Sequence, residues 1–238
     1  MDPDPPLRYP ARVKPYSIVY KDALPHGIVA GVCLPADGAP PSESDMAALH
    51  PDERSAARHH RGFRLSSYVG GRLAAHAAVR ALGGPFTGIG TGPRGAPVAP
   101  AGIALSITHK RTLAIAVAAK SEHGDLGVDL EDYGPPRPSI EEHILRPEER
   151  TELAPLPDDR KWIALVLRFS IKESIYKALD PYVNRYVGFH EAQVRPDLEG
   201  GAAVALYLKN GEGPFEVDAR YCWLAGRLVT SARIRRAP

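Results

Sequence analysis

The chain of 238 residues is long enough for one large domain or two small ones, and it can bury a sizeable hydrophobic core. Hydrophobic residues make up 44% and charged residues 24% of the sequence, which is ordinary for a soluble globular protein. The formal net charge of +2 argues against a dominant role in nucleic-acid binding, so we expect no nucleic-acid partner.

Cysteine content and hydropathy indicate a cytoplasmic protein. The two cysteines, Cys33 and Cys222, do not amount to a disulfide framework. Residues 1–15 contain five prolines and lack the apolar core of a signal peptide. No apolar run approaches the ~20 residues that a membrane-spanning helix needs, so we expect no membrane span.

The first half begins with strands and continues with helices. Short strands are predicted at 18–22 and 27–34, and helical spacing of apolar residues follows from about 45 to 82, with a proline break after the first short helix. Residues 83–101 form a loop rich in glycine and proline. Three strands follow, at 103–109, 112–120 and 125–131.

The second half begins with helices. Residues 141–153 are predicted to be helical with an interruption at Pro147, and residues 160–179 form a long helix. The acidic pair 158–159 starts this helix, and we expect it to stop before 180–181 because a residue that precedes proline disfavours the helical conformation.

The last quarter alternates like strands at 202–209, 215–220 and 223–234. The order of strands, helices, strands, helices and strands predicts an α+β protein of two similar-sized halves, 1–120 and 121–238.

One tempting motif is rejected. Gly90, Gly92 and Gly95 fit the G-x-G-x-x-G fingerprint of dinucleotide-binding folds, which must open a helix and be followed about 20 residues on by an acidic residue. Prolines follow closely instead, and the position expected to be acidic is Lys110. We therefore expect no dinucleotide site here.

Two carboxylates share one face of the strand predicted in LGVDLEDY, residues 126–133. Asp129 and Glu131 point the same way because side chains alternate along a strand. Either this face lies in water or something positive lies between the two side chains. On the long helix, Glu173 and Lys177 are four residues apart and share a face, and a structural salt bridge between them is the simplest interpretation.

Combining the strand and the helix gives a more specific hypothesis. Asp129, Glu131 and Glu173 together would form an oxygen-rich site for Mg²⁺, which completes its coordination with water and substrate phosphates. Lys172 and Lys177 would supply positive charge to phosphate oxygens. A metal ion with lysines is the equipment of phosphoryl transfer.

Basic residues also gather elsewhere. His109 ends a predicted strand and is followed by Lys110 and Arg111. Arginines recur at helical spacing upstream, at Arg54, Arg58, Arg61 and Arg64. An ordinary solvated surface is the default for both groups, and a phosphate site is the alternative.

These segments resemble a known family. GVDLE at 127–131 and FSIKESIYK at 169–177 resemble the two signature motifs of the 4′-phosphopantetheinyl transferases. RGAPVAP at 94–100 and LSITH at 105–109 are similar to two further family segments in the same order. YVGGRLAAHAA at 68–78 resembles a helix of the siderophore-synthetase-associated branch.

The resemblance implies a fold and an activity. The fold would be a monomer of two similar α/β halves, related by a pseudo-two-fold axis, with the active site at their interface. Residues 1–120 would contact the nucleotide of coenzyme A, and residues 121–238 would carry the Mg²⁺ and catalytic motifs. The enzyme would move the phosphopantetheine arm of coenzyme A onto a serine of an apo acyl or peptidyl carrier protein and release 3′,5′-ADP. Which carrier is modified does not follow from the sequence.

The resemblance also implies roles for the acidic residues and lysines. Asp129, Glu131 and Glu173 would bind Mg²⁺, and Glu173 would also act as the base for the carrier serine. Lys172 and Lys177 would hold the pyrophosphate of coenzyme A. Asp129, Glu173 and Lys177 would thus form the catalytic set.

Contacts to the phosphates and nucleotide end of coenzyme A are implied for His109, Thr108, Arg61, Arg64, Arg72 and Arg94. Two positions depart from the family pattern. Ala96 stands where the family has a lysine, and Arg94 could substitute for it. Thr108 replaces the common serine and keeps a hydroxyl.

Two other functions fit parts of the pattern. Another Mg²⁺-dependent enzyme that cleaves a nucleotide pyrophosphate would use the same carboxylates and lysines, but would not explain the order of all four segments. A catalytically silent carrier-binding module would have no reason to retain the complete set of charged residues.

Overall fold

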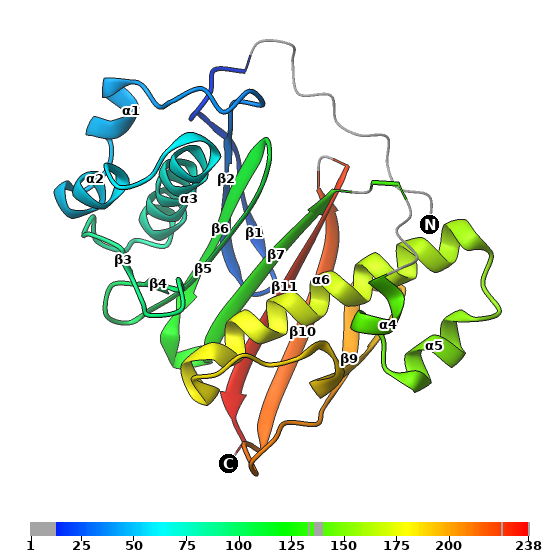
Figure 1. Ribbon diagram of the computed structural model, residues 1–238. Coiled ribbons are helices and arrows are strands. Elements are labelled where there is room, and N and C mark those ends of the chain that lie inside the picture. The colour runs from blue at the N-terminus through cyan, green and yellow to red at the C-terminus, as the bar shows by residue number, and fades with distance from the viewer. Residues whose placement is uncertain (1–12, 133, 136–139, 225, 238) are drawn as a thin grey trace. The chain divides into compact units, whose positions relative to one another are not determined.

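The computed structural model describes residues 13–132, 134–135, 140–224 and 226–237. The chain divides into two compact units, an N-terminal unit, Arg8–Leu126, and a C-terminal unit, Gly127–Pro238. Each unit combines one main sheet with helices, including one long helix (Figure 1). This organisation confirms the predicted α+β class.

The N-terminal unit contains a four-stranded sheet in the order β1-β2-β6-β5, with neighbouring strands antiparallel. Its strands are β1 (Ile18–Leu24), β2 (Gly27–Cys33), β5 (Ile103–Lys110) and β6 (Leu113–Lys120). Its helices are α1 (Glu43–Ala47), α2 (Pro51–Ala57), α3 (Gly62–Ala81) and the short η1 (Ser121–His123). Figure 1 shows α3 lying along this sheet, where it packs on β2, β5 and β6.

Small residues allow α3 to approach its sheet closely. A Cβ atom at Gly70 would lie 2.2 Å from the Leu34 side chain, and one at Gly71 would lie 3.0 Å from Ile107. Glycine inside a helix costs ~1 kcal/mol relative to alanine, so this close packing must offset that loss. The predicted helical stretch therefore forms, and its small residues face the sheet.

The glycine-rich loop forms a hairpin of two short strands, β3 (Gly90–Thr91) and β4 (Pro97–Val98). The Gly92 N–H donates to the Ala96 carbonyl at 2.8 Å, which closes the turn. Because the stretch leads into a strand, the rejection of a dinucleotide-binding helix is confirmed.

The C-terminal unit contains a five-stranded sheet in the order β7-β11-β10-β9-β8. Its strands are β7 (Asp125–Asp132), β8 (Ala192–Pro196), β9 (Gly201–Leu206), β10 (Phe215–Leu224) and β11 (Arg227–Arg236). The helices are α4 (Glu141–Ile144), α5 (Pro147–Leu153), α6 (Asp158–Val183) and the short η3 (Phe189–Glu191). The sequence did not predict β8, which is short and ends in proline.

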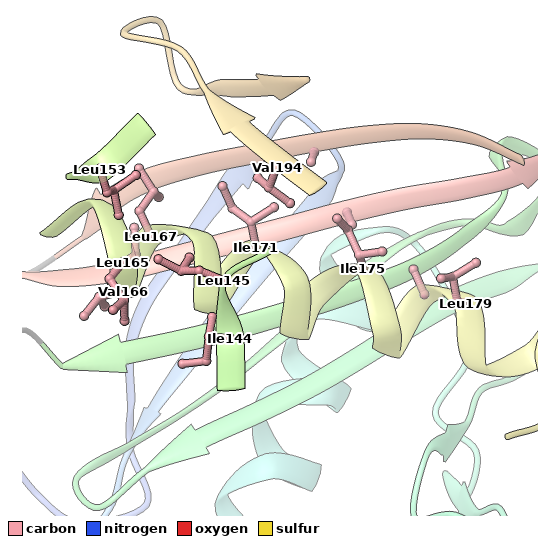
Figure 2. Packing of buried hydrophobic residues seen from close by; sticks show 14 of the residues in the cluster. Ile144, Leu145, Leu153, Leu165, Val166, Leu167, Ile171, Ile175, Leu179 and Val194 are labelled. Carbon is pink, nitrogen blue, oxygen red and sulfur yellow. The ribbon is translucent and has the colours of Figure 1, made fainter. Parts of the chain in front are cut away.

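Helix α6 supplies much of the core of this unit. It packs on β8, β10 and β11 and also contacts α4 and α5. Figure 2 shows its apolar side chains interleaved with those of its neighbours; the buried set includes Ile144, Leu145, Leu153, Leu165, Ile171, Ile175, Leu179 and Val194. Burying one leucine or isoleucine side chain contributes roughly 1.5–3 kcal/mol, so the position of α6 is strongly fixed.

The end of α6 differs from the prediction. The helix continues through Pro181 to Val183 instead of stopping before residues 180–181. Pro181 lies in the last turn, and the following Asn184 adopts the left-handed conformation with φ 52° while its N–H donates to the Asp180 carbonyl at 3.1 Å. A proline so close to the end removes little of the helical hydrogen-bond ladder. In the described parts of the chain, no helix is long and apolar enough to cross a membrane.

Candidate active site

A glycine brings α6 against β7. A Cβ atom at Gly127 would lie only 1.7 Å from the Ser174 carbonyl oxygen and 2.8 Å from the Ala178 backbone nitrogen. No other residue leaves room for this approach, because real Cβ atoms do not come so close to backbone atoms. Gly127 and Asp129 lie on the same face of the strand, so the face that carries the paired carboxylates meets α6.

Asp129 is held by two side chains of α6. The Lys177 Nζ donates to Asp129 Oδ1 at 2.8 Å and to the Val128 carbonyl at 2.9 Å. The Ser170 hydroxyl donates to Asp129 Oδ2 at 2.8 Å. Asp129 is only 5% exposed, so its charge is compensated by a lysine and a hydroxyl instead of by bulk water. A solvated strand face is therefore the wrong interpretation for Asp129.

The other two predicted metal ligands lie on the same pair of elements. Glu131 follows Asp129 on the same face of β7, and Glu173 lies on α6; both are half-buried. Over the part of the chain that the structure describes, no three histidine, cysteine, aspartate or glutamate side chains are grouped closely enough to hold a metal ion. The three carboxylates therefore do not form a preassembled cage.

Lys172 does not lie where the sequence placed it. Its side chain is fully buried, and its Nζ donates to Glu149 Oε2 at 2.6 Å, to the Ile144 carbonyl at 2.8 Å and to the Phe189 carbonyl at 3.1 Å. An ammonium group has three donors, and all three are used inside the protein. The predicted contact between Lys172 and a pyrophosphate conflicts with this geometry and is corrected.

Burial and pairing act in opposite directions on Lys172. Loss of solvent lowers the pKa of its ammonium group, and the hydrogen bond and charge of Glu149 raise it, with a net lowering. Lys172 and Glu149 are both 0% exposed, so the pair is a structural element of the core.

Glu149 was missed by sequence reasoning. It also accepts from the Val194 N–H at 2.8 Å and from the Arg146 N–H at 2.9 Å, and so links α5 to β8. The available signal was local: Pro147 followed by Glu149 fits the start of a helix with a capping box. Nothing local indicates that the same Oε2 also receives Lys172, or that Oε1 receives the Val194 N–H.

The N-terminal unit has a basic cavity of its own. The cavity has a volume of about 480 Å³ and is lined by Leu34, Phe63, Arg64, Ser67, His109, Lys110 and Arg111. It brings together Arg64 and His109, two residues predicted to contact coenzyme A. The Arg111 guanidinium lies 4.4 Å from the centre of the Phe63 ring, so an aromatic face and a cation meet at the same cavity.

The remaining predicted contacts lie outside the residues that line this cavity. Arg72 is 6% exposed and donates to the Gly90 carbonyl at 2.9 Å and to the Thr91 hydroxyl at 2.8 Å, which ties α3 to the β3–β4 hairpin. Arg61 precedes α3 and donates to two nearby carbonyls. Thr108 is buried on β5. Arg94 is exposed in the hairpin turn.

Comparisons with known proteins cover most of the chain. Residues 125–229 match the 4′-phosphopantetheinyl transferase superfamily. Residues 52–119 match the 4′-phosphopantetheinyl transferase N-terminal domain. The first segment contains β7 and α6, and the second contains α3 and the strand that ends near His109.

Three relatives are similar over shorter or longer stretches. 4′-Phosphopantetheinyl transferase Npt of Nocardia iowensis is 33% identical over 164 residues, which cover 65% of this chain and 67% of that protein. 4′-Phosphopantetheinyl transferase Svp of Streptomyces mobaraensis is 32% identical over 204 residues, 82% of each chain. Enterobactin synthase component D of Salmonella typhimurium is 34% identical over 137 residues, 55% of this chain and 54% of that protein. The resemblance seen in the sequence is confirmed, and the chain belongs to the 4′-phosphopantetheinyl transferase superfamily.

Proposed function

We propose that this transferase uses Asp129, Glu173 and Lys177 to move the phosphopantetheine arm of coenzyme A onto a serine of an apo carrier protein. The observation that carries the proposal is the buried Asp129 carboxylate, clamped between Lys177 and Ser170 at the contact of β7 with α6. Water is largely excluded from this carboxylate and its lysine. Their charges would therefore interact more strongly with a phosphate group than they would in water.

The reaction needs no further reactant. The serine hydroxyl loses its proton to a base, for which we propose Glu173, and its oxygen forms a bond to the phosphorus that bears pantetheine. The bond from this phosphorus to the bridging oxygen of the pyrophosphate breaks, and 3′,5′-ADP leaves with the electron pair. Glu173 is half-buried on α6, so its carboxylate remains accessible to the hydroxyl of a carrier serine.

The carboxylates fit Mg²⁺. Asp129, Glu131 and Glu173 offer only oxygen donors, which hard cations prefer. Mg²⁺ is usually held by one or two carboxylates together with substrate phosphates and water, so a preassembled cage of three ligands is not required. Bound Mg²⁺ would neutralise pyrophosphate charge and stabilise the leaving group. These three residues would hold it.

Lys177 complements this role. Its ammonium group contacts Asp129 Oδ1. Because its side chain is 31% exposed, it can also contact a bound anion while it stays paired with Asp129. We propose that Lys177 contacts the pyrophosphate. Lys172 is excluded from this role by its three internal acceptors.

For the nucleotide end of coenzyme A we propose the basic cavity of the N-terminal unit. Arg64, His109, Lys110 and Arg111 supply cationic donors there, and about 480 Å³ lies within the usual range for small-molecule sites. The predicted division of labour, with nucleotide contacts in residues 1–120 and metal chemistry in residues 121–238, is part of this proposal.

The partners follow from the family. Its members use coenzyme A, and the similarity to an enterobactin synthase component supports a carrier of siderophore or other secondary-metabolite synthesis as the acceptor. A monomeric cytoplasmic enzyme with no nucleic-acid partner is also part of the proposal.

Intact-protein mass spectrometry of apo carrier proteins tests the function. Each carrier is incubated with this protein, coenzyme A and Mg²⁺, and we expect a mass gain equal to one phosphopantetheine arm that disappears when the metal is chelated. Asp129→Ala and Glu173→Ala should fold and fail to produce the gain. If either variant transfers at near-normal rates, the residue assignment is wrong. If the wild-type protein modifies no acyl or peptidyl carrier, the proposed acceptor is wrong.

A further inference from the structure

We propose that Ser170 is a positioning residue that fixes the Asp129 carboxylate for metal binding, and that Thr230 on β11 orients the Ser170 hydroxyl. This inference rests on the proposed role of Asp129 as a metal ligand. Ser170 belongs to the FSIKESIYK segment, but neither the sequence pattern nor the comparisons give its hydroxyl a role, and Thr230 lies outside the quoted motifs.

The contacts form a short chain inside the C-terminal unit. The Ser170 Oγ lies 2.8 Å from Asp129 Oδ2 and 2.9 Å from Thr230 Oγ1, and the Thr230 hydroxyl also lies 2.8 Å from the Ser170 carbonyl. Ser170 and Thr230 are both 0% exposed. No bulk water competes for these hydrogen bonds, so the positions of the two hydroxyls are set by the protein alone.

The number of protons on these groups determines which hydroxyl donates each hydrogen bond. An ionised carboxylate only accepts hydrogen bonds, so the single Ser170 proton is donated to Asp129. The Ser170 oxygen is then left as an acceptor, and Thr230 donates its own proton toward that oxygen and the Ser170 carbonyl. The Ser170 hydroxyl dipole therefore points toward Asp129, and the single Thr230 proton, shared between the Ser170 carbonyl and the Ser170 Oγ, holds that oxygen in place.

Ser170 and Lys177 hold different oxygens of Asp129. Lys177 contacts Oδ1 and is partly exposed, whereas Ser170 contacts Oδ2 from within the core. A carboxylate offers about four lone-pair sites. One neutral donor on Oδ2 therefore fixes the rotation of the group without adding a second cation to it. Partners of this kind orient metal ligands in many proteins.

The chain supplies a matched control one turn further along α6. Ser174 is also fully buried, but its hydroxyl donates to the Ile171 carbonyl at 2.8 Å within the helix. Replacing either serine by alanine removes the same atom from the same helix. Only the change at Ser170 removes a donor from Asp129.

The test is Mn²⁺ binding in the presence of coenzyme A, measured from the electron paramagnetic resonance signal of free Mn²⁺. Ser170→Ala should weaken Mn²⁺ binding about 10- to 100-fold, as losses of such supporting contacts do. Ser174→Ala should bind like the wild-type protein. Thr230→Val, which keeps the shape and loses the hydroxyl, should show a smaller loss, and Thr230→Ser, which retains the hydroxyl, should restore binding.

The outcomes separate this inference from the proposed function. If the wild-type protein binds Mn²⁺ and Ser170→Ala binds it equally well, the positioning role is wrong and the metal site stands. If Ser174→Ala weakens binding as much as Ser170→Ala, the effect is general to the helix and the inference fails. If the wild-type protein binds no Mn²⁺, both the metal assignment and the inference are overturned. Should Ser170→Ala fail to fold, equal binding by Thr230→Val and Thr230→Ser would contradict the proposal.

Discussion

Lys172 and Lys177 lie five residues apart on one helix and occupy opposite environments. Lys172 is 0% exposed and uses its three donors on Glu149 and two backbone carbonyls. Lys177 is 31% exposed and pairs with Asp129. Five residues turn a helix by about 140°, so one lysine faces α4 and α5 while the other faces β7.

The difference shows that two lysines of one motif can serve different ends. Lys172 joins segments of the core, and its replacement should act on folding. Lys177 lies at the proposed reaction site, and its replacement should act on rate. Stability and transfer measured on the same variants distinguish the two roles.

The largest expected effect is on the stability of Lys172→Met. This variant leaves Glu149 buried without its cation, and losing one partner of a buried pair costs about 3–5 kcal/mol in the free energy of unfolding. Urea unfolding measures this loss. Lys172→Met combined with Glu149→Gln removes the stranded charge, so we expect it to recover much of the stability and to transfer normally once folded. If the double variant folds but transfers much more slowly than the wild-type protein, Lys172 does take part in the reaction.

Lys177→Gln should show the reverse pattern. Removing a cation from the reacting phosphate is expected to slow transfer about 100-fold, as for other preorganised electrostatic groups. The free energy of unfolding should fall by only about 1–2 kcal/mol, because the side chain is partly exposed. Single-turnover transfer to a carrier protein measures the rate. If Lys177→Gln loses more stability than Lys172→Met, the roles assigned to the two lysines are wrong.

Gly127→Ala tests the close contact between β7 and the face of α6 that carries Lys177. The new Cβ would overlap the Ser174 carbonyl, so we expect α6 to shift from β7 at a cost of about 1–3 kcal/mol. Transfer should fall along with stability because Ser170 and Lys177 move away from Asp129. The Lys172–Glu149 pair lies on another side of α6 and should persist. An alanine variant with normal stability and rate would show that the close approach is unnecessary.

The last expected effect concerns the residues just beyond the end of α6, where Arg185 pairs with both Glu191 and Glu212 and the stability change depends on pH. Hydrogen bonds from Arg185 lower the pKa of Glu191 from 4.5 to about 2. A lowered acid pKa stabilises the fold above the unfolded value, and this stability is lost as the pH falls from 4.5 toward 2. About 2 kcal/mol should disappear between pH 5 and pH 3 in the wild-type protein.

Arg185→Met provides the control for this pH dependence. Without the guanidinium, the pKa of Glu191 should return toward its ordinary value, so the variant should be less stable at pH 7 and should lose less on acidification. Urea unfolding at pH 7, 5 and 3 measures both proteins. Parallel pH profiles would show that Arg185 does not set the acidity of Glu191.

Local patterns predicted most elements and the strand face that carries the paired carboxylates. Alternation in the described residues 126–132 correctly predicted a strand with its carboxylates on one face, and helical spacing located α3 and α6. Rotation of a packed helix about its axis is not local information, because it depends on which side chains the core accepts. The environment of Lys172 was therefore mistaken.

The partners of single residues were harder still to predict. Ser170 meets Thr230 across 60 positions of sequence, and Lys172 meets Glu149 across 23. Hydroxyls and carboxylates have no periodic signature for such partners. Arg64 and His109 were predicted to serve the same ligand, and the cavity that joins them depends on the packing of α3 beside β5.

The most direct test of the account is a crystal structure of the protein with coenzyme A and Mn²⁺, measured with X-rays near the manganese absorption edge. We expect an anomalous peak bonded to the Asp129 carboxylate, Lys177 on the pyrophosphate, and Lys172 still paired with Glu149. A peak away from Asp129, or Lys172 bound to the pyrophosphate, would contradict the assignment of these two lysines.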